Sequence, residues 1–260
     1  MSNGTLLFLG TGGSMGIPVI GCDCSVCSSD NPCNKRLRPS VLLQVSGKQF
    51  LVDAGPEFRV QALRYGISRL DGVLFTHSHH DHVAGIDDLR AYSYKNQIPL
   101  PTLVSEETAK DLRSRFFYLF DPKTPSASAA GARFDLQVLE GKRGTVDFNG
   151  LHVRYVTYEQ GGMQVNGFIV GSLAYLSDIR NYPETLFADL EGVDTVIISA
   201  LRFTSSPLHF TVDEAVDFIQ KSGVKKGLLT HVSHDLDHDK TNAYLPSHIR
   251  MAYDGMIVEF

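Results

Sequence analysis

The stretch His77-Ser78-His79-His80-Asp81-His82 decides the fold, and it directly follows the apolar run Gly72-Val73-Leu74-Phe75-Thr76. The apolar run predicts a buried strand, so the hexapeptide is expected on the loop where that strand ends. Four of the ten histidines of the chain lie within these six residues. Because imidazole and carboxylate groups bind divalent metals, the hexapeptide indicates a metal site rather than a solvated polar loop.

The spacing within the hexapeptide predicts two half-sites for metal. Residues two apart in an extended segment point the same way, so His77 and His79 are expected to bind one ion. Asp81 and His82 follow after the chain has begun to turn, and we expect them to bind a second ion. His80 is the spare histidine, expected to face solvent or a supporting polar group.

Two further ligands are expected where other apolar strands end. Asp178 follows the apolar run Leu173 to Ser177, and it is the best candidate for a carboxylate that bridges two ions. His231 follows Gly227-Leu228-Leu229-Thr230, and it is the best candidate for the last imidazole. Each residue alone is an ordinary turn former or a satisfied histidine, but the shared position after a strand favours a common site.

Composition and charge narrow the classes of function. The 260 residues are 43% hydrophobic and 20% charged, and we expect a single domain over residues 1–260. Lysine and arginine total 24 against 29 acidic residues, a net charge of -5 that argues against nucleic acid as a general partner. The N-terminus lacks a basic region and no apolar run approaches the roughly 18 residues of a membrane span, so we expect no membrane association and a cytoplasmic location.

Strand and helix patterns alternate in both halves of the chain, with frequent hairpins. This favours two sheets packed face to face with helices outside, an α/β (α+β) fold, over a simple doubly wound parallel sheet. Residues 121–133, rich in Pro, Ser, Ala and Gly, are expected to be a loop. Strands are expected at 5–9, 40–45, 49–53, 72–75, 102–104, 146–148, 151–156, 167–170, 173–176, 195–198, 227–229 and 256–259, and helices at 57–65, 87–94, 106–118, 183–190 and 211–221.

The hexapeptide, together with Leu176-Ser177-Asp178 and Leu229-Thr230-His231, resembles the metallo-β-lactamase superfamily. The opening Gly10-Thr11-Gly12-Gly13-Ser14 and the later Gly21-Cys22-Asp23-Cys24-Ser25-Val26-Cys27 narrow the resemblance to the PhnP-like phosphodiesterase branch. The resemblance implies an αββα sandwich with the metals at one edge between the sheets. It also implies hydrolysis of a small cyclic or diester phosphate.

The resemblance also assigns roles within the metal site. One metal would use His77, His79 and Asp178, and the other would use Asp81, His82, Asp178 and His231. A metal-bound hydroxide would then attack phosphorus, without a serine or cysteine nucleophile. The expected cofactors are one or two divalent metals, manganese or zinc, with Asp81 counted among the catalytic residues.

One position departs from the resembled pattern. The branch places a third histidine for the first metal just before the Gly167-Phe168 strand, and the counted position here is Gln160. A glutamine oxygen suits hard cations such as Mn²⁺ or Mg²⁺ and is a poor ligand for zinc. We therefore expect a weakened first site, with fewer than two ions per chain or a preference for manganese.

Three of the four cysteines, Cys22, Cys24 and Cys27, lie within six residues, which in a reducing compartment favours metal ligation over disulfides. A tetrahedral zinc needs a fourth ligand. The resemblance supplies His234, which would make a structural zinc site, and Cys33 is the rival fourth ligand.

Two residues are candidates for substrate contacts. His209 lies just before the helix expected from Thr211, close to the positive end of its dipole. In the resembled branch the matching histidine contacts phosphate or protonates the leaving group. Arg202 is a weaker candidate for a second phosphate contact. His238 and its acidic neighbours are expected to form a solvated loop, and Lys35-Arg36-Leu37-Arg38 to be structural.

Four functions compete. The leading one is a metal-dependent phosphodiesterase with a small phosphorylated substrate. The alternatives are a nuclease that processes tRNA 3′ ends, a weakened member that binds metal or a phosphorylated ligand without turnover, and a biosynthetic helper like the pyrroloquinoline-quinone branch. A homodimer is expected by analogy alone.

Overall fold

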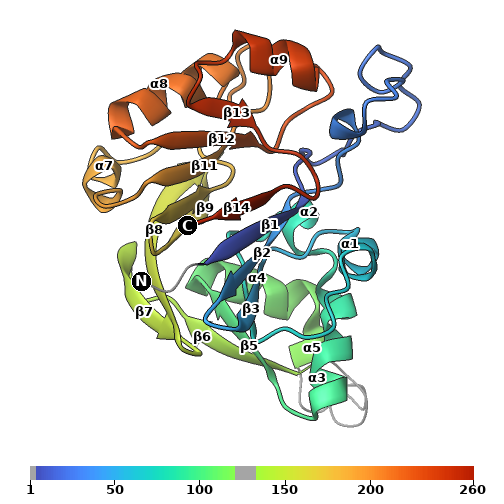
Figure 1. The fold of residues 1–260 in the computed structure, drawn as a ribbon. Coiled ribbons are helices and arrows are strands. Elements are labelled where there is room, and N and C mark those ends of the chain that lie inside the picture. The colour runs from blue at the N-terminus through green and yellow to red at the C-terminus, as the bar shows by residue number, and fades with distance from the viewer. Residues whose placement is uncertain (1–3, 121–132) are drawn as a thin grey trace.

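Two seven-stranded sheets pack face to face, and helices cover their outer faces (Figure 1). The computed structural model describes residues 4–120 and 133–260. This arrangement confirms the αββα sandwich expected from the sequence. At one edge of the first sheet, the strand near the C-terminus pairs with the first strand of the chain.

The first sheet has the order β14-β1-β2-β3-β4-β5-β6. Neighbours from β14 to β3 are antiparallel, whereas β3, β4, β5 and β6 run parallel. In chain order the strands are β1 (Thr5–Gly10), β2 (Ser40–Val45), β3 (Lys48–Val52), β4 (Gly72–Leu74), β5 (Leu100–Val104), β6 (Phe134–Val138) and β14 (Ile257–Glu259).

The second sheet has the order β13-β12-β11-β10-β9-β8-β7. Strands β10 to β13 run parallel, whereas β7, β8, β9 and β10 form antiparallel pairs. The strands are β7 (Arg143–Phe148), β8 (Leu151–Gln160), β9 (Met163–Val170), β10 (Leu173–Leu176), β11 (Thr195–Ser199), β12 (Lys226–Thr230) and β13 (Ile249–Met251).

The parallel strands explain where the chemistry gathers. Their buried apolar runs end at one edge of each sheet, and ligands in such folds bind outside the carboxyl ends of the strands. Between the sheets, aromatic side chains such as Phe8, Phe50, Phe148 and Phe168 form a common core. This core fixes the two edges relative to each other, because close-packed interiors deform little.

Helices shield the outer faces of both sheets (Figure 1). The first sheet is covered by α1 (Phe58–Arg64), α3 (Arg90–Asn96), α4 (Glu106–Arg115) and α5 (Phe117–Phe120), and the second by α7 (Leu186–Asp189) and α8 (Val212–Ser222), with α9 (His238–Tyr244) against β13. The one-turn helix α2 (His80–Val83) and the 3₁₀ turns η1 (Pro32–Asn34) and η2 (Ile86–Leu89) complete the described elements.

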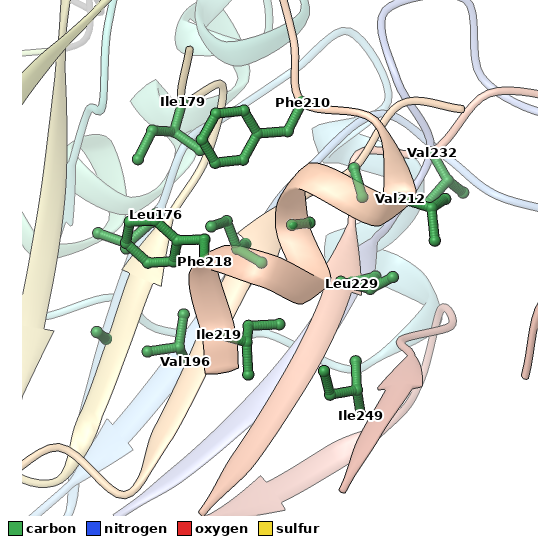
Figure 2. Packing of buried hydrophobic residues seen from close by; sticks show 14 of the residues in the cluster. Leu176, Ile179, Val196, Phe210, Val212, Phe218, Ile219, Leu229, Val232 and Ile249 are labelled. Atoms are coloured by element: carbon green, nitrogen blue, oxygen red, sulfur yellow. The ribbon is translucent and has the colours of Figure 1, made fainter. Parts of the chain in front are cut away.

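Helix α8 shows how the sequence determines where a covering helix begins, where it ends and which face it buries. Its N-cap Thr211 and Glu214 form the capping box, and Gly223 at the other end has a φ of 69°, a conformation that glycine adopts at little cost. Phe218 and Ile219 pack onto Leu176, Val196 and other apolar residues of the second sheet (Figure 2). Burying each such side chain contributes roughly 1.5–3 kcal/mol.

Several expected elements differ from the observed ones. The helix expected at 183–190 is limited to α7, because Pro183 accepts a hydrogen bond from Leu186 in a turn. The helix expected at 106–118 breaks at Phe116 into α4 and α5. Strands β6 and β13 were not predicted, because β6 is a half-exposed edge strand and β13 has only three residues. Of the loop expected at 121–133, residues 121–132 lie outside the described residues.

No helix in the described ranges combines the length and apolar character that a membrane crossing requires.

Candidate metal centre

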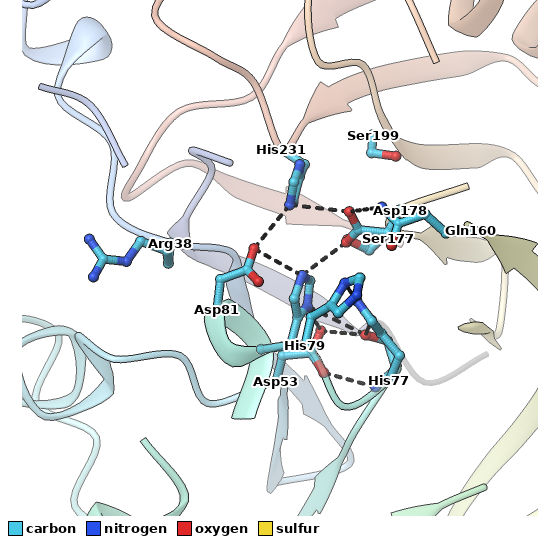
Figure 3. A network of polar contacts seen from close by, with 12 residues as sticks. Arg38, Asp53, His77, His79, Asp81, Gln160, Ser177, Asp178, Ser199 and His231 are labelled. Carbon is cyan, nitrogen blue, oxygen red and sulfur yellow. Dashed lines mark hydrogen bonds and ion pairs between the residues drawn. The ribbon is translucent and has the colours of Figure 1, made fainter. Parts of the chain in front are cut away.

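The expected metal ligands lie at the ends of β4, β10 and β12, where the two sheets face each other (Figure 3). His77 and His79 follow β4, Asp178 follows β10 and His231 follows β12. Asp178 and His231 have φ values of 54° and 55°, in the left-handed region that non-glycine residues rarely adopt. Such strained backbone persists where surrounding contacts hold it, and it is frequent at functional sites.

Four side chains of the expected second half-site converge. Asp178 Oδ2 lies 2.9 Å from His82 Nε2, and Asp178 Oδ1 lies 3.2 Å from His231 Nε2. Asp81 Oδ2 lies 3.3 Å from His231 Nε2 and 3.5 Å from His82 Nε2. All four residues are buried. Helix α2 is responsible for the position of Asp81 and His82, because it begins at His80 and turns both side chains towards the other sheet.

The first half-site is less complete. His77 Nε2 lies 2.9 Å from His79 Nδ1, as expected for residues two apart on an extended segment. His77 also groups with His82 and Asp178, but His79 belongs to none of the three-residue groups of potential ligands found among the described residues. His80 is exposed, as expected.

Gln160, the last residue of β8, lies inside the cluster and is buried. Its Nε2 donates to Asp178 Oδ1 over 3.1 Å and lies 3.2 Å from the imidazole of His209. Its Oε1 is buried without a hydrogen-bond partner. The amide nitrogen thus uses Asp178 Oδ1, an atom that could also bind an ion, as its hydrogen-bond acceptor.

His209 is closer to the cluster than its sequence position indicated. Its Nδ1 lies 3.1 Å from Asp178 Oδ1, and its ring stacks on His231 with centroids 4.9 Å apart. Asp178, His209 and His231 form a three-residue group of potential ligands. Arg202 is not in this cluster; it lines a neighbouring cavity of about 150 Å³ together with His209.

The buried charges of the cluster are balanced by protons or by a bound cation. Burial alone would lower the pKa of His82, but Asp81, Asp178 and Asp53 outweigh that effect and raise this pKa well above its usual range. Burial likewise raises the pKa of Asp178, but His231 and His82 hold it well below its usual range. Nδ1 of His82 faces Asp53, so Nε2 must direct either a proton or a metal ion towards Asp81 and Asp178.

The donor set fits divalent metals. His77 is neutral, because burial and then the neighbouring His82 lower its pKa well below its usual range. A neutral imidazole and ionised carboxylates are the forms that bind metal. The buried His/Asp groups are therefore consistent with a centre for two ions, in which the second half-site has more of its ligands in place than the first.

Asp53 belongs to the candidate metal centre by its contacts, and the sequence reasoning missed it. This fully buried carboxylate follows β3 and lies 2.7 Å from Nδ1 of His82. It also accepts hydrogen bonds from the backbone N–H and the hydroxyl of Thr76, both over 2.8 Å. A carboxylate behind a ligand imidazole fixes the ring's orientation and tautomer. Its signal was available, since Asp53 ends an apolar strand as Asp178 and His231 do.

A second cluster joins the N-terminal region to the segment after His231. Sγ atoms of Cys22, Cys24 and Cys27 lie 3.3, 3.5 and 3.5 Å from Nδ1 of His234. These four residues form a group of potential ligands, and Cys33 lies outside it. The backbone N–H of Cys27 contributes most to lowering the pKa of Cys24 to about 6, which favours the thiolate that binds metal.

The expectation that His238 lies in a solvated loop is wrong. His238 begins α9 and is buried, and its Nδ1 lies 3.0 Å from Nη2 of Arg36. Arg36, which is itself buried, also donates to Thr11 and to the carbonyl of Ala252. The basic run around Arg36 is thus structural, as expected.

A larger cavity of about 670 Å³ lies away from both clusters. Its lining includes Thr195 and Lys226, the first residues of β11 and β12. His231 follows the opposite end of β12, and Asp178 follows the same end of the parallel strand β10, so the cavity's size does not connect it with the site.

Two mixed sheets with buried His/Asp ligand groups at one shared edge define the class of αββα metallo-hydrolases. A sequence profile of the β-lactamase superfamily domain matches residues 48–232. The crystal structure of a new diphosphatase from the PhnP family superposes with a TM-score of 0.91 at 38% sequence identity, covering 100% of this chain and 98% of that chain. The chain therefore belongs to the metallo-β-lactamase superfamily and, within it, to the PhnP family.

Two curated relatives are matched over half of their own length or less. An octanoyltransferase of Porphyromonas gingivalis is 33% identical over 259 residues, 96% of this chain but 50% of that protein. Because the chain spans half the length of that relative, the relative's activity is not carried over to it. A ribonuclease Z of Bradyrhizobium diazoefficiens is 42% identical over 64 residues, 24% of this chain and 21% of that protein.

Proposed function

We propose that this protein is a metal-dependent hydrolase that cleaves a phosphorus–oxygen bond of a small phosphate diester or organic diphosphate, with organic diphosphates as the leading class. One observation carries the proposal: His82 Nε2 lies between the carboxylates of Asp81 and Asp178, where a bound cation would balance their charge. The similarity to a PhnP-family diphosphatase over the full chain supports the diphosphate class.

The residues divide into two proposed ligand sets. Asp81, His82, Asp178 and His231 would hold one ion. His77, His79 and Asp178 would hold the other, completed by the oxygen of Gln160. When bound, divalent ions polarise phosphoryl oxygens and lower the pKa of a bound water. The charges of the buried carboxylates and imidazoles act more strongly on a bound substrate than they would in water, because little bulk water screens them.

His209 is the proposed general acid. Hydrolysis adds the oxygen of water to phosphorus, and the leaving oxygen must receive a proton as its bond to phosphorus breaks. His209 is less buried than the other imidazoles in contact with Asp178, and it lies between the cluster and the adjoining cavity. A proton donated by His209 would thus reach a leaving group in that cavity.

The identity of each metal follows from its donors. Three thiolates and one imidazole are the set of a structural zinc site, so we assign zinc to Cys22, Cys24, Cys27 and His234. At the catalytic centre, Gln160 offers an amide where the family pattern has an imidazole. Amide oxygens suit hard cations, so we expect manganese to support activity better than zinc.

Hydrolysis of bis-p-nitrophenyl phosphate and of phenyl diphosphate, measured with added Mn²⁺, tests the proposed reaction. Asp81→Ala removes one carboxylate ligand, and we expect a loss of activity of at least about 100-fold, because an outer partner alone is worth about 10- to 100-fold. Full activity in Asp81→Ala would exclude the proposed site.

A second candidate function follows from the contact between Gln160 and Asp178. If the amide keeps an ion from the first half-site, the protein binds a phosphorylated ligand with little turnover. Gln160→His separates the two cases: activity that appears only in this variant supports the weakened member, whereas comparable wild-type activity supports the enzyme. The matches to ribonuclease Z cover between about a quarter and a half of the chain, and the net charge of -5 does not favour an RNA substrate.

A further inference from the structure

The imidazole of His77 has a hydrogen-bond partner at each of its ring nitrogens. Its Nδ1 lies 2.9 Å from the hydroxyl oxygen of Thr76, and its Nε2 lies 2.9 Å from Nδ1 of His79. A neutral imidazole carries its single proton on one nitrogen or on the other. The position of this proton therefore decides whether His77 donates to Thr76 or to His79.

Only one of these two forms leaves the first half-site open to a metal ion. With the proton on Nε2, His77 donates to His79, and the two nitrogens that face each other are joined by a hydrogen bond. With the proton on Nδ1, both facing nitrogens can offer a lone pair, as metal binding requires. The proposed ligand set thus needs His77 in the Nδ1–H form.

The hydroxyl of Thr76 favours this form. It donates its proton to Oδ2 of Asp53 over 2.8 Å, so its oxygen can only accept from the Nδ1–H of His77. Oδ2 of Asp53 also lies 2.7 Å from Nδ1 of His82. The same buried carboxylate therefore orients an imidazole of each half-site, directly for His82 and through a hydroxyl for His77.

The backbone of Thr76 fixes the position of this hydroxyl. Its N–H donates to Oδ1 of Asp53 over 2.8 Å. Its carbonyl accepts hydrogen bonds from the backbone N–H of Asn166 over 2.9 Å and from the side-chain Nδ2 over 3.0 Å. Thr76, Asp53 and Asn166 are all buried, so water competes little for these groups. Because Asn166 belongs to β9, Thr76 is held by both sheets.

We propose that Thr76 is a positioning residue of the metal centre, whose hydroxyl keeps the proton of His77 on Nδ1 and thereby leaves Nε2 free to bind an ion. The inference rests on the proposed function, in which His77 is a metal ligand. Without the hydroxyl, the Nδ1–H of His77 would be buried without an acceptor, which is costly. The proton then moves to Nε2, where His79 accepts it, and the half-site closes to metal although every ligand is still present.

Thr76→Val tests the proposal, because valine keeps the branched side chain and removes the hydroxyl. Calorimetric titration of Mn²⁺ into the full-length protein should show the ion of the first half-site bound about 10- to 100-fold more weakly, as is typical when a partner of a ligand is lost. The ion held by Asp81, His82, Asp178 and His231 should bind close to wild type, because Asp53 still contacts His82. Thr76→Ser restores a hydroxyl and should restore the affinity. Unchanged affinities in Thr76→Val, or an equal loss for both ions, would overturn the proposal.

The position of the proton gives a readout that requires neither metal nor turnover. Long-range proton–nitrogen correlation spectra of protein labelled at histidine, recorded before Mn²⁺ is added, distinguish the Nδ1–H form from the Nε2–H form. His77 should be Nδ1–H in wild type and in Thr76→Ser, and Nε2–H in Thr76→Val. An Nε2–H form in wild type, or an Nδ1–H form kept in Thr76→Val, would overturn the proposal. These spectra decide the proposal even if the protein hydrolyses no phosphate ester.

Thr102→Val is the matched control. Thr102 is buried on β5, the strand beside β4, and its hydroxyl donates to the carbonyl of Leu100 over 3.0 Å. This variant also loses a buried hydroxyl from the first sheet, but not one that contacts a ligand candidate. It should keep the wild-type metal affinity and the Nδ1–H form of His77. A loss of affinity as large as that in Thr76→Val would assign the effect to packing and would contradict the proposal.

Discussion

One carboxylate, that of Asp178, is shared among three imidazoles and an amide. Oδ1 contacts His231, His209 and Gln160, and Oδ2 contacts His82 and accepts a hydrogen bond from Ser177. Buried charges are stable only when paired. A metal ion and a proton are alternative ways to balance this cluster, so metal binding should displace protons.

The contact between His82 Nδ1 and Asp53 leads to a prediction about a single residue. Asp53→Asn removes the charge behind the imidazole, and we expect a 10- to 100-fold weaker metal affinity, as is typical for such partners. Asn also tolerates the φ of 62° found at position 53, so the backbone should be preserved. Metal titration monitored by calorimetry measures the change.

Asp135→Asn is the control for this substitution, because Asp135 is exposed on the edge strand β6. It should bind metal as wild type does. An affinity of Asp53→Asn within about twofold of wild type would show that Asp53 does not act on the metal centre.

At the scale of elements, the cysteine cluster links the loop before η1 to the segment after β12. We expect Cys24→Ala to release one zinc per chain and to lower the melting temperature by several degrees, because each kcal/mol lost shifts Tm by about 2–4 °C in a chain of this size. Plasma mass spectrometry and calorimetric melting measure the two effects.

The control for Cys24→Ala is the same substitution at the fourth cysteine, Cys33. Cys33 lies outside the ligand group, so Cys33→Ala should retain its zinc and melt close to wild type. Loss of zinc from Cys33→Ala, or retention of it in Cys24→Ala, would assign the ligands differently.

The sequence predicted the elements that carry strong local signals. His77, Asp178 and His231 each follow a buried apolar strand, and the capping box of α8 marks that helix directly. The contacts that the sequence did not reveal join distant segments. Arg36 and His238 are 202 residues apart, and the charged neighbours of each, basic around Arg36 and acidic around His238, suggest exposure. The contact of Gln160 with Asp178 and His209 likewise depends on how β8 and β10 pack, which periodicity does not specify.

At the scale of the molecule, buried hydrogen bonds of Asp254 join the C-terminal segment to segments near the N-terminus. Asp254 accepts hydrogen bonds from the Thr11 hydroxyl over 2.7 Å and from the Leu37 N–H over 2.8 Å. Burial raises the pKa of Asp254 to about 6, above the value of about 3.8 expected for the unfolded chain. Its contribution to stability is therefore full below about pH 3.8 and is lost as the pH rises through about 6.

Asp254→Asn removes this titration. We expect the free energy of unfolding of wild type, taken relative to this variant, to fall by about 2 kcal/mol between pH 4 and pH 7. Urea unfolding of both proteins across that range measures the difference. A difference that is constant with pH would place the pKa of Asp254 near its ordinary value.

The central claim is that the His/Asp cluster is a metal centre that hydrolyses a small phosphate diester or diphosphate. The most direct test strips the protein of metal, restores it with Mn²⁺, and measures phosphate release from phenyl diphosphate in wild type and in Asp178→Asn. We predict that activity is lost on stripping, returns with Mn²⁺ in wild type, and does not return in Asp178→Asn. Hydrolysis that persists without metal, or that survives the loss of the Asp178 charge, would contradict the claim.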